Sequence, residues 1–190
     1  MIPYGRQDIT DEDIDAVKTV LQSDFLTQGS ALPEFENSIC EYTHARHAIG
    51  VNSGTSALHL ACRAMGLSKG DILWTPAITF ASSANCGLFC DANVDFIDID
   101  PEDWNLSVEK LEIKLRSAES ENKLPKIIVI VHFAGLSCHL QAIHDLCKKY
   151  GIYLIEDACH ALGAKYNSEP IGSCKFSDVV TFSFHPVKSI

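Results

Sequence analysis

The chain has 190 residues, of which 46% are hydrophobic and 21% are charged, as in ordinary globular proteins. This length suits one domain with a sizeable core, so we expect residues 1–190 to form a single domain. The formal net charge of -10 argues against a protein that binds nucleic acid non-specifically. The sequence shows neither a signal peptide nor a run of about 18 apolar residues, which predicts a cytoplasmic protein without membrane segments.

The eight cysteines carry little sign of a metal site or a disulfide framework. They are too scattered for a zinc ribbon, and a chain of this size does not need disulfides for its stability. Cys86 and Cys90 form the closest pair, and no second pair completes a site. We therefore expect no bound metal and mostly buried free thiols in a reducing compartment.

Two helices are predicted before residue 45. Thr10 and Asp13 resemble a capping box at the start of the first, and Pro33 suits the first position of the second. Apolar residues recur at helical spacing in both, namely Ile14, Val17 and Leu21, then Phe35, Ile39 and Tyr42.

The remainder alternates between strand-like and helix-like stretches. Six strand-like runs cover residues 47–52, 71–75, 94–99, 126–132, 152–156 and 178–184. Helices are predicted after Ser53, ending at Gly66, and over 107–118 and 139–150, the last ending at Gly151. The runs "KIIVIVHF" and "IYLIEDA" are continuously apolar, which is typical of strands buried on both faces. This rhythm predicts an α/β fold of three layers, with a mostly parallel sheet flanked by helices.

In such a fold ligands bind beyond the carboxyl ends of the strands. The stretch "NSGTSALHL" begins a helix directly after a predicted strand, so its free N–H groups and hydroxyls could bind an anion. The simpler alternative is a serine N-cap without a ligand, which is common.

Glu156 and Asp157 end an otherwise apolar strand, where a carboxylate is costly unless it is paired. Asp157 could cap the following helix, or it could pair with a protonated ring nitrogen of a ligand. His160 lies one helical turn further and could face the same space, although an isolated histidine is more often a packed or surface residue.

Lys188 is the strongest single candidate. Most lysines are solvated surface charges, but this one follows the apolar run "VVTFSF" and the pair His185 and Pro186. A desolvated lysine at the ligand edge of a sheet can lose its proton and act as a nucleophile. With the anion site, Asp157 and the aromatic Phe80, it indicates pyridoxal phosphate, which needs a phosphate cradle, a partner for its ring nitrogen, a flat wall and an amine. The motifs of Rossmann and P-loop nucleotide sites are absent.

Six motifs occur in the order found in one known family: "NSGTSALHLA", "TPAITFASSAN", "VDFIDIDP", "VHFAG", "IEDACHALGA" and "TFSFHPVKSI". The chain resembles the DegT/DnrJ-type sugar aminotransferases, which are pyridoxal-phosphate enzymes of fold type I. The stretches "MIPYGRQDIT", "SDFLTQG" and "FHPVK" most resemble the subgroup that acts in pseudaminic acid biosynthesis.

This resemblance implies a role for each candidate residue. Lys188 would bond covalently to the cofactor and shuttle a proton, and Asp157 would pair with the pyridine nitrogen. Phe80 would stack on the ring, and His160 would sit beside it. The residues expected to hold the phosphate are Gly54, Thr55 and Ser183. The residues expected on the substrate side are Tyr4, Arg6, Thr27, Gln28 and Gly29.

The implied reaction transfers an amino group from L-glutamate to the 4-keto group of a UDP-linked 4-keto-6-deoxy-N-acetyl-hexosamine. The product would be a UDP-4-amino-4,6-dideoxy sugar for cell-surface glycans. A dehydratase branch of the family has histidine in place of the lysine, so Lys188 favours transamination. The resemblance also implies a homodimer.

Members of this family continue for about as long again after the lysine, with a final strand of the large domain and a smaller second domain. We therefore expect an amino-terminal fragment that lacks both. The alternatives are a non-catalytic remnant that binds cofactor or sugar nucleotide, one half of a split enzyme, and an unrelated nucleotide-binding α/β module.

Overall fold

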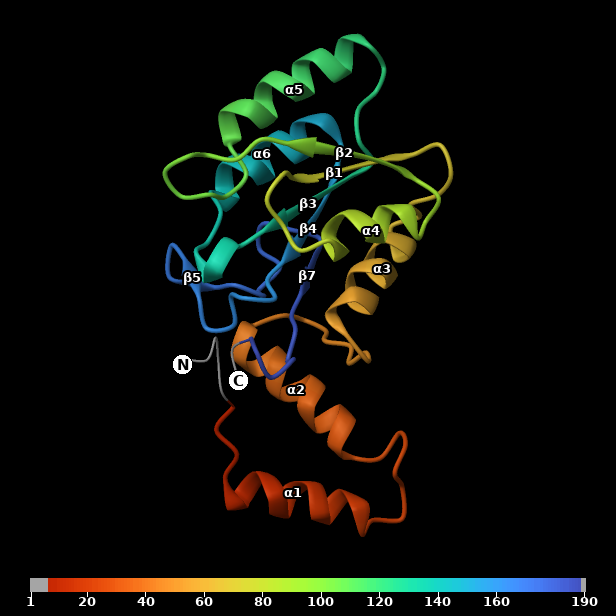
Figure 1. The fold of residues 1–190 in the computed structure, drawn as a ribbon, viewed down its shortest axis with the longest axis vertical. Helices are drawn as coiled ribbons and strands as arrows, with labels where there is room; N and C mark the ends of the chain where they lie inside the picture. Colours follow the sequence, from red (N-terminus) through yellow and green to blue (C-terminus); the bar gives the residue numbers. More distant parts are fainter. Residues whose placement is uncertain (1–6, 189–190) are drawn as a thin grey trace, which may run out of the picture.

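The computed structural model describes residues 7–188, which form a three-layer α/β fold. Five parallel strands make one sheet in the order β2-β1-β3-β4-β7 (Figure 1). The strands are β1 (Ile72–Pro76), β2 (Asn93–Ile97), β3 (Ile127–Val131), β4 (Tyr153–Asp157) and β7 (Val179–Thr181). A separate antiparallel hairpin, which the sequence did not reveal, joins β5 (Lys165–Tyr166) to β6 (Glu169–Pro170). The predicted parallel sheet is confirmed.

Helices cover both faces of this sheet. One layer contains α3 (Gly54–Ala64) and α4 (Ser82–Leu88), and the other contains α5 (Val108–Ser120) and α6 (Leu140–Tyr150). A short 3₁₀ turn, η1 (Phe133–Gly135), follows β3. No helix within residues 7–188 has the length and apolar character that crossing a membrane requires.

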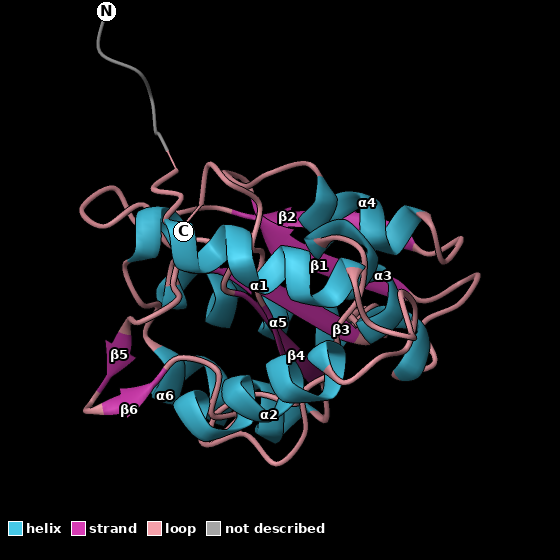
Figure 2. Cartoon of the chain, turned by 90° about the horizontal axis from the view of Figure 1, so that it is seen from below, coloured by secondary structure: helices cyan, strands magenta, loops and turns pink. Residues whose placement is uncertain are grey.

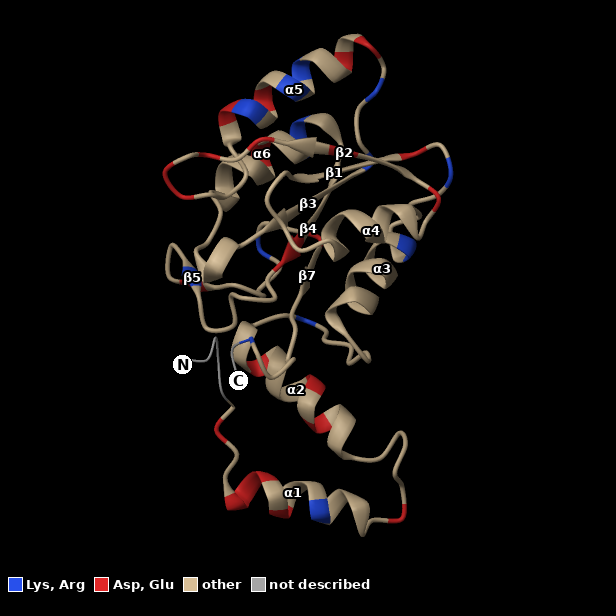
Figure 3. Cartoon of the chain, viewed as in Figure 1, with Lys and Arg blue, Asp and Glu red and all other residues tan. Residues whose placement is uncertain are grey.

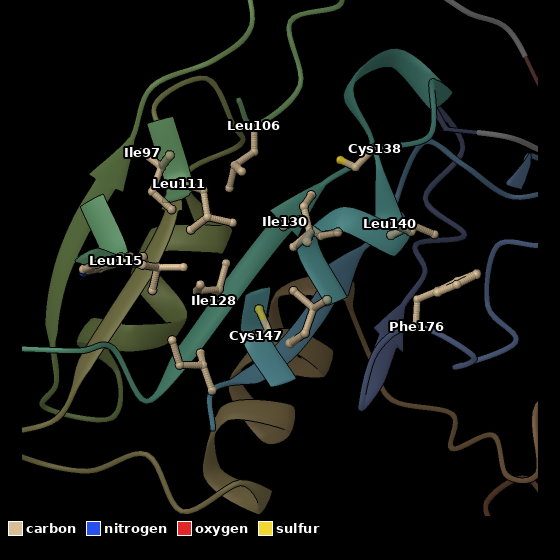
Figure 4. Packing of buried hydrophobic residues seen from close by; sticks show 14 of the residues in the cluster. Ile97, Leu106, Leu111, Leu115, Ile128, Ile130, Cys138, Leu140, Cys147 and Phe176 are labelled. Carbon is tan, nitrogen blue, oxygen red and sulfur yellow. The ribbon is translucent and has the colours of Figure 1, made fainter. Parts of the chain in front are cut away.

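The strands are continuously apolar because their alternate side chains enter two separate cores. In β3, Ile127 and Val129 pack with α3 and α4, whereas Ile128 and Ile130 pack with α5 and α6 (Figure 4). All four side chains are fully buried. The same alternation continues along β4, so its last two residues, Glu156 and Asp157, face opposite helical layers.

Capping explains where several helices begin and end. Thr10 caps α1 (Asp11–Leu21) through the predicted capping box, in which its N–H donates to Asp13 Oδ2 at 2.8 Å. Gly151 ends α6 with a left-handed φ of 67°, as its position after the helical stretch predicted. Pro33 is the third residue of α2 (Ala31–Thr43), so its predicted place at the first helical position is wrong.

The apolar stripe of α1 is uncovered within residues 7–188. Ile14, Val17 and Leu21 are 56%, 60% and 66% exposed, and no residue of this helix is buried. Figure 1 shows α1 on the far side of α2 from the sheet, and in Figure 2, seen from below, α1 lies in front of the sheet. Figure 3 shows the acidic first turn of α1. The helical pattern was therefore a correct guide to the helix, although the stripe does not pack on the sheet.

The strand predicted over residues 47–52 is wrong. These residues form no strand, and within the described chain the edge strand β7 pairs only with β4. Ile49 is 82% exposed, so its apolar side chain does not bring the segment onto the sheet. The N–H of Gly50 donates instead to Glu36 Oε1 at 2.7 Å. An apolar run becomes a strand only where a neighbouring backbone takes its hydrogen bonds.

All eight cysteines are free thiols, as predicted, and five of them are buried. Burial raises the pKa of the Cys147 thiol to about 12. Thiolate is therefore scarce at this position near neutral pH, which favours a packing role over a reactive one.

Two isoleucine substitutions test the packing of β3 against the helices. We expect Ile130→Ala to lower the free energy of unfolding by about 2–5 kcal/mol, because it leaves a cavity between the sheet and α6. Ile113→Ala, on the exposed face of α5, is the matched control and should change stability by less than about 0.5 kcal/mol. Urea unfolding followed by circular dichroism measures both, and equal losses would contradict the two-core packing.

Candidate functional site

The predicted site residues follow the carboxyl ends of three different parallel strands. Phe80 follows β1, His160 follows β4 and Lys188 follows β7, while Asp157 is the last residue of β4. Because all these strands run in the same direction, their carboxyl ends lie along one edge of the sheet (Figure 1). This is the edge at which α/β sheets bind ligands.

Lys188 lies beside two other predicted residues. Its Nζ is 2.8 Å from His160 Nε2 and 5.7 Å from the centroid of the Phe80 ring. The Lys188 N–H donates to the carbonyl of His185 at 2.8 Å, so the His-Pro pair forms a turn before the lysine. The structure thus brings an amine, an imidazole and an exposed aromatic face together.

The proton on His160 can be assigned from its surroundings. Partial desolvation of the ring lowers the pKa of His160, the nearby Lys188 ammonium lowers it further, and Asp157 opposes the shift. A histidine with a lowered pKa is mainly neutral at pH 7. Its Nε2 therefore accepts a hydrogen bond from the Lys188 ammonium, and its own proton lies on Nδ1.

Asp157 is only 4% exposed, and both of its oxygens have donors. Oδ2 accepts from the Ser83 hydroxyl at 2.8 Å, and Oδ1 accepts from the Cys159 N–H at 3.2 Å. A carboxylate has about four acceptor positions, so two donors leave room for another. No helix follows β4 within the described chain, so the predicted role of Asp157 as a helix cap is wrong. Asp157 instead stabilises the turn after β4 through the Cys159 N–H, and it can still accept a hydrogen bond from a ligand.

The amino terminus of α3 provides a second polar corner. Ser53 is its N-cap and accepts from the Ser56 N–H at 3.1 Å. A Cβ added to Gly54 would lie 3.2 Å from Cys159 Sγ and 3.4 Å from the Ser183 Cβ, so it would crowd the sulfur and touch the serine. Gly54 and Ser183 are therefore adjacent, with the free N–H groups of the helix start beside them.

The hydroxyl of Thr55 lies near a residue that the sequence did not single out. Its Oγ1 is 2.7 Å from Ser82 Oγ, and the next residue, Ser83, is the donor to Asp157. Thr79 Oγ1 donates in turn to Ser83 Oγ at 2.7 Å. The stretch "TFASSAN" held the signal for these residues, because it places three hydroxyls directly after a predicted strand.

The predicted substrate-side residues do not join this cluster. Thr27, Gln28 and Gly29 lie in the loop between α1 and α2, and in residues 7–188 no hydrogen bond joins this loop to the Lys188 cluster. Tyr4 and Arg6 lie outside the described residues. The substrate-side assignment of all five residues stays a prediction.

Glu156, the other acid at the end of β4, has a partner for each carboxylate oxygen on the opposite face. Its Oε2 is 2.8 Å from His132 Nε2, and its Oε1 accepts from the Ser177 hydroxyl at 2.6 Å. The Cys138 N–H donates to His132 Nδ1 at 3.1 Å, which places the ring proton on Nε2. Glu156 is thus a structural acid that joins the end of β4 to the loops after β3 and β6.

Comparisons with known proteins agree with this geometry. Residues 7–190 match the model of the DegT/DnrJ/EryC1/StrS aminotransferase family. The UDP-4-amino-4,6-dideoxy-N-acetyl-beta-L-altrosamine transaminase of Campylobacter jejuni subsp. jejuni serotype O:2 is 47% identical over 190 residues. That match covers 100% of this chain and 49% of the relative, so the chain spans about half the length of the curated relatives it matches.

Solved structures share the fold. PseC of Helicobacter pylori, described as an aminotransferase of pseudoaminic acid biosynthesis, superposes with a TM-score of 0.89 at 34% identity, covering 98% of this chain and 48% of that one. A putative sugar aminotransferase of Streptococcus pneumoniae in its PLP form superposes with a TM-score of 0.85 at 28% identity, covering 98% and 50%. The family predicted from six sequence motifs is confirmed: this chain belongs to the DegT/DnrJ/EryC1/StrS aminotransferases.

Proposed function

We propose that this chain supplies the lysine and the pyridoxal phosphate site of a nucleotide-sugar aminotransferase. The observation that carries the proposal is the contact of Lys188 Nζ with His160, beside Phe80 and at the same sheet edge as Asp157. The finer proposal is transfer of an amino group from L-glutamate to the 4-keto group of a UDP-linked 4-keto-6-deoxy-N-acetyl-hexosamine. The name of the Campylobacter jejuni relative supports this substrate class.

The donor set fits pyridoxal phosphate. The phosphate would lie at the start of α3, against Gly54, Thr55 and Ser183, where N–H groups and hydroxyls are available. Asp157 has acceptor capacity left for a protonated ring nitrogen, and Phe80, 70% exposed, offers a free ring face. When bound, the cofactor supplies an electron sink for the reacting carbon.

The chain's own residues would prepare and move protons. Neutral His160 accepts a hydrogen bond from the Lys188 ammonium, so it can also take the proton that the amine must lose before acting as a nucleophile. Lys188, once free again, would carry a proton from one carbon to another. Asp157 would keep the ring nitrogen protonated through its charge, and Phe80 would shield one face of the ring from water.

The activity of the whole protein depends on more than this site. We propose residues 1–190 as one cofactor-binding domain and a homodimer as the working assembly. The apolar stripe of α1 is exposed, with Leu21 66% exposed, which supports the need for a further polypeptide domain or subunit that packs on this helix. The second candidate function is therefore a cofactor-binding chain that converts substrate only after such a domain or subunit is added.

Covalent labelling tests the cofactor site. Incubation with pyridoxal phosphate and reduction with borohydride should label Lys188, as identified by peptide mass spectrometry, because its amine lies beside His160 and Phe80 at the proposed ring site. Lys188→Ala should lose the label. Lys175→Ala, which removes a surface lysine paired with Glu169, is the control and should keep it. Stoichiometric label elsewhere would overturn the assignment.

Turnover separates the two candidate functions. With L-glutamate and the UDP-linked keto-sugar, an active aminotransferase should yield the UDP-amino sugar and 2-oxoglutarate, detected by mass spectrometry. If Lys188 is labelled but amination requires an added polypeptide matching the remaining length of the relatives, the second candidate holds. Loss of turnover in Lys188→Ala, with folding intact, is expected in either case.

The charge contact at His160 gives a prediction about pH. Lys188→Ala should raise the pKa of His160 toward its ordinary value, because a positive neighbour that disfavours the imidazolium is removed. An NMR titration of the imidazole carbon-bound protons measures this. Lys110→Ala, on the exposed face of α5, is the control and should leave the midpoint unchanged. An unchanged midpoint in Lys188→Ala would contradict the contact.

A further inference from the structure

We propose that Ser82 and Ser83, the first two residues of α4, are positioning residues that align opposite ends of the cofactor site. Ser82 acts through Thr55 at the phosphate end, and Ser83 acts through Asp157 at the ring-nitrogen end. The inference rests on the proposed pyridoxal phosphate site and extends it to residues outside the predicted site set.

The direction of the hydrogen bonds at Ser83 is determined by its neighbours. Ser83 is fully buried, and its hydroxyl oxygen accepts a hydrogen bond from the Thr79 hydroxyl at 2.7 Å. An ionised carboxylate only accepts, so the proton of Ser83 points at Asp157 Oδ2, 2.8 Å away. Hydrogen bonds to an ionised group are stronger than those between neutral groups. Ser83 therefore holds one oxygen of Asp157 in place and leaves the remaining lone pairs for the ring nitrogen.

The same reasoning gives a direction to the bond at Ser82. Its side chain is 6% exposed and lies 2.7 Å from Thr55 Oγ1. Phosphate oxygens are acceptors, so a phosphate bound by Thr55 would take the proton of its hydroxyl as a hydrogen bond. Ser82 would then donate to Thr55 and fix the orientation of that hydroxyl.

One short helix can serve both ends because consecutive residues of a helix point about 100° apart. Ser82 thus reaches α3 while Ser83 reaches β4. The backbone of α4 packs directly against β2, because Gly87 has no side chain and a Cβ there would lie only 2.8 Å from the Val94 side chain. This close packing leaves the helix little freedom to shift. Phe80 lies two residues before Ser82, so the proposed ring wall belongs to the same segment.

Three probes separate the two ends. Pyridoxal phosphate carries both groups, pyridoxal lacks the phosphate, and 1-deaza-pyridoxal phosphate has a C–H group in place of the ring nitrogen. We expect Ser83→Ala to weaken pyridoxal phosphate binding about tenfold and to leave the deaza analogue unaffected. Ser82→Ala should weaken pyridoxal phosphate binding about tenfold and leave pyridoxal unaffected. Absorbance titrations give the dissociation constants.

Each serine variant is the matched control for the other, and urea midpoints check that both remain folded. Thr79→Val, which keeps the shape but removes the donor to Ser83, should shift binding in the same direction as Ser83→Ala, by less. Equal losses for both phosphate-bearing probes in Ser83→Ala and Thr79→Val, or no loss in either, would overturn the role of Ser83. A loss of pyridoxal binding in Ser82→Ala would overturn the role of Ser82. Wild-type protein that binds none of the probes would overturn the proposed function itself, before any variant is compared.

Discussion

A carboxylate buried away from water destabilises a folded protein unless it accepts strong hydrogen bonds. Strand β4 ends in two buried carboxylates. Because side chains alternate along the strand, Glu156 and Asp157 need their donors on opposite faces of the sheet. Glu156 obtains them from the loops after β3 and β6, through His132 and Ser177. Asp157 obtains one from α4, through Ser83. The charge at one strand end thus holds together segments from both helical layers.

The site follows from this constraint. Ser83 holds the carboxylate of Asp157, and the Cys159 N–H donates to the same carboxylate and so fixes the turn after β4. This turn places the His160 ring beside the Nζ of Lys188. Gly135 allows the backbone of His160 to approach closely, because a Cβ at Gly135 would lie only 2.7 Å from the His160 carbonyl oxygen. Rigid strands and their immediate turns, rather than long loops, therefore set the distances between the polar groups.

The sequence was a good guide wherever the relevant physics is local. Continuous apolar runs identified β3 and β4, and the places after strand ends identified Lys188, His160 and Phe80 as neighbours. Prediction from the sequence failed where contacts with distant residues decide the secondary structure. The apolar run at 47–52 looks like a strand but pairs with none in the described chain. Five of the seven residues of α4, "SSANCGL", are weak helix formers (Ser, Asn, Cys and Gly), so the helix and its two serine contacts become visible only in the fold.

The order of these segments along the chain has a consequence for how the protein is made. Gly54 lies in the first third of the sequence and Lys188 near its far end, with four parallel strand crossovers between them. Parallel pairings of this kind form late, because each requires a long stretch of chain to close. A nascent chain on the ribosome therefore lacks the amine of the proposed cofactor site until synthesis has passed Lys188. Once β4 has packed, the Ser83 hydroxyl and the Cys159 N–H satisfy the carboxylate of Asp157 before any ligand is bound.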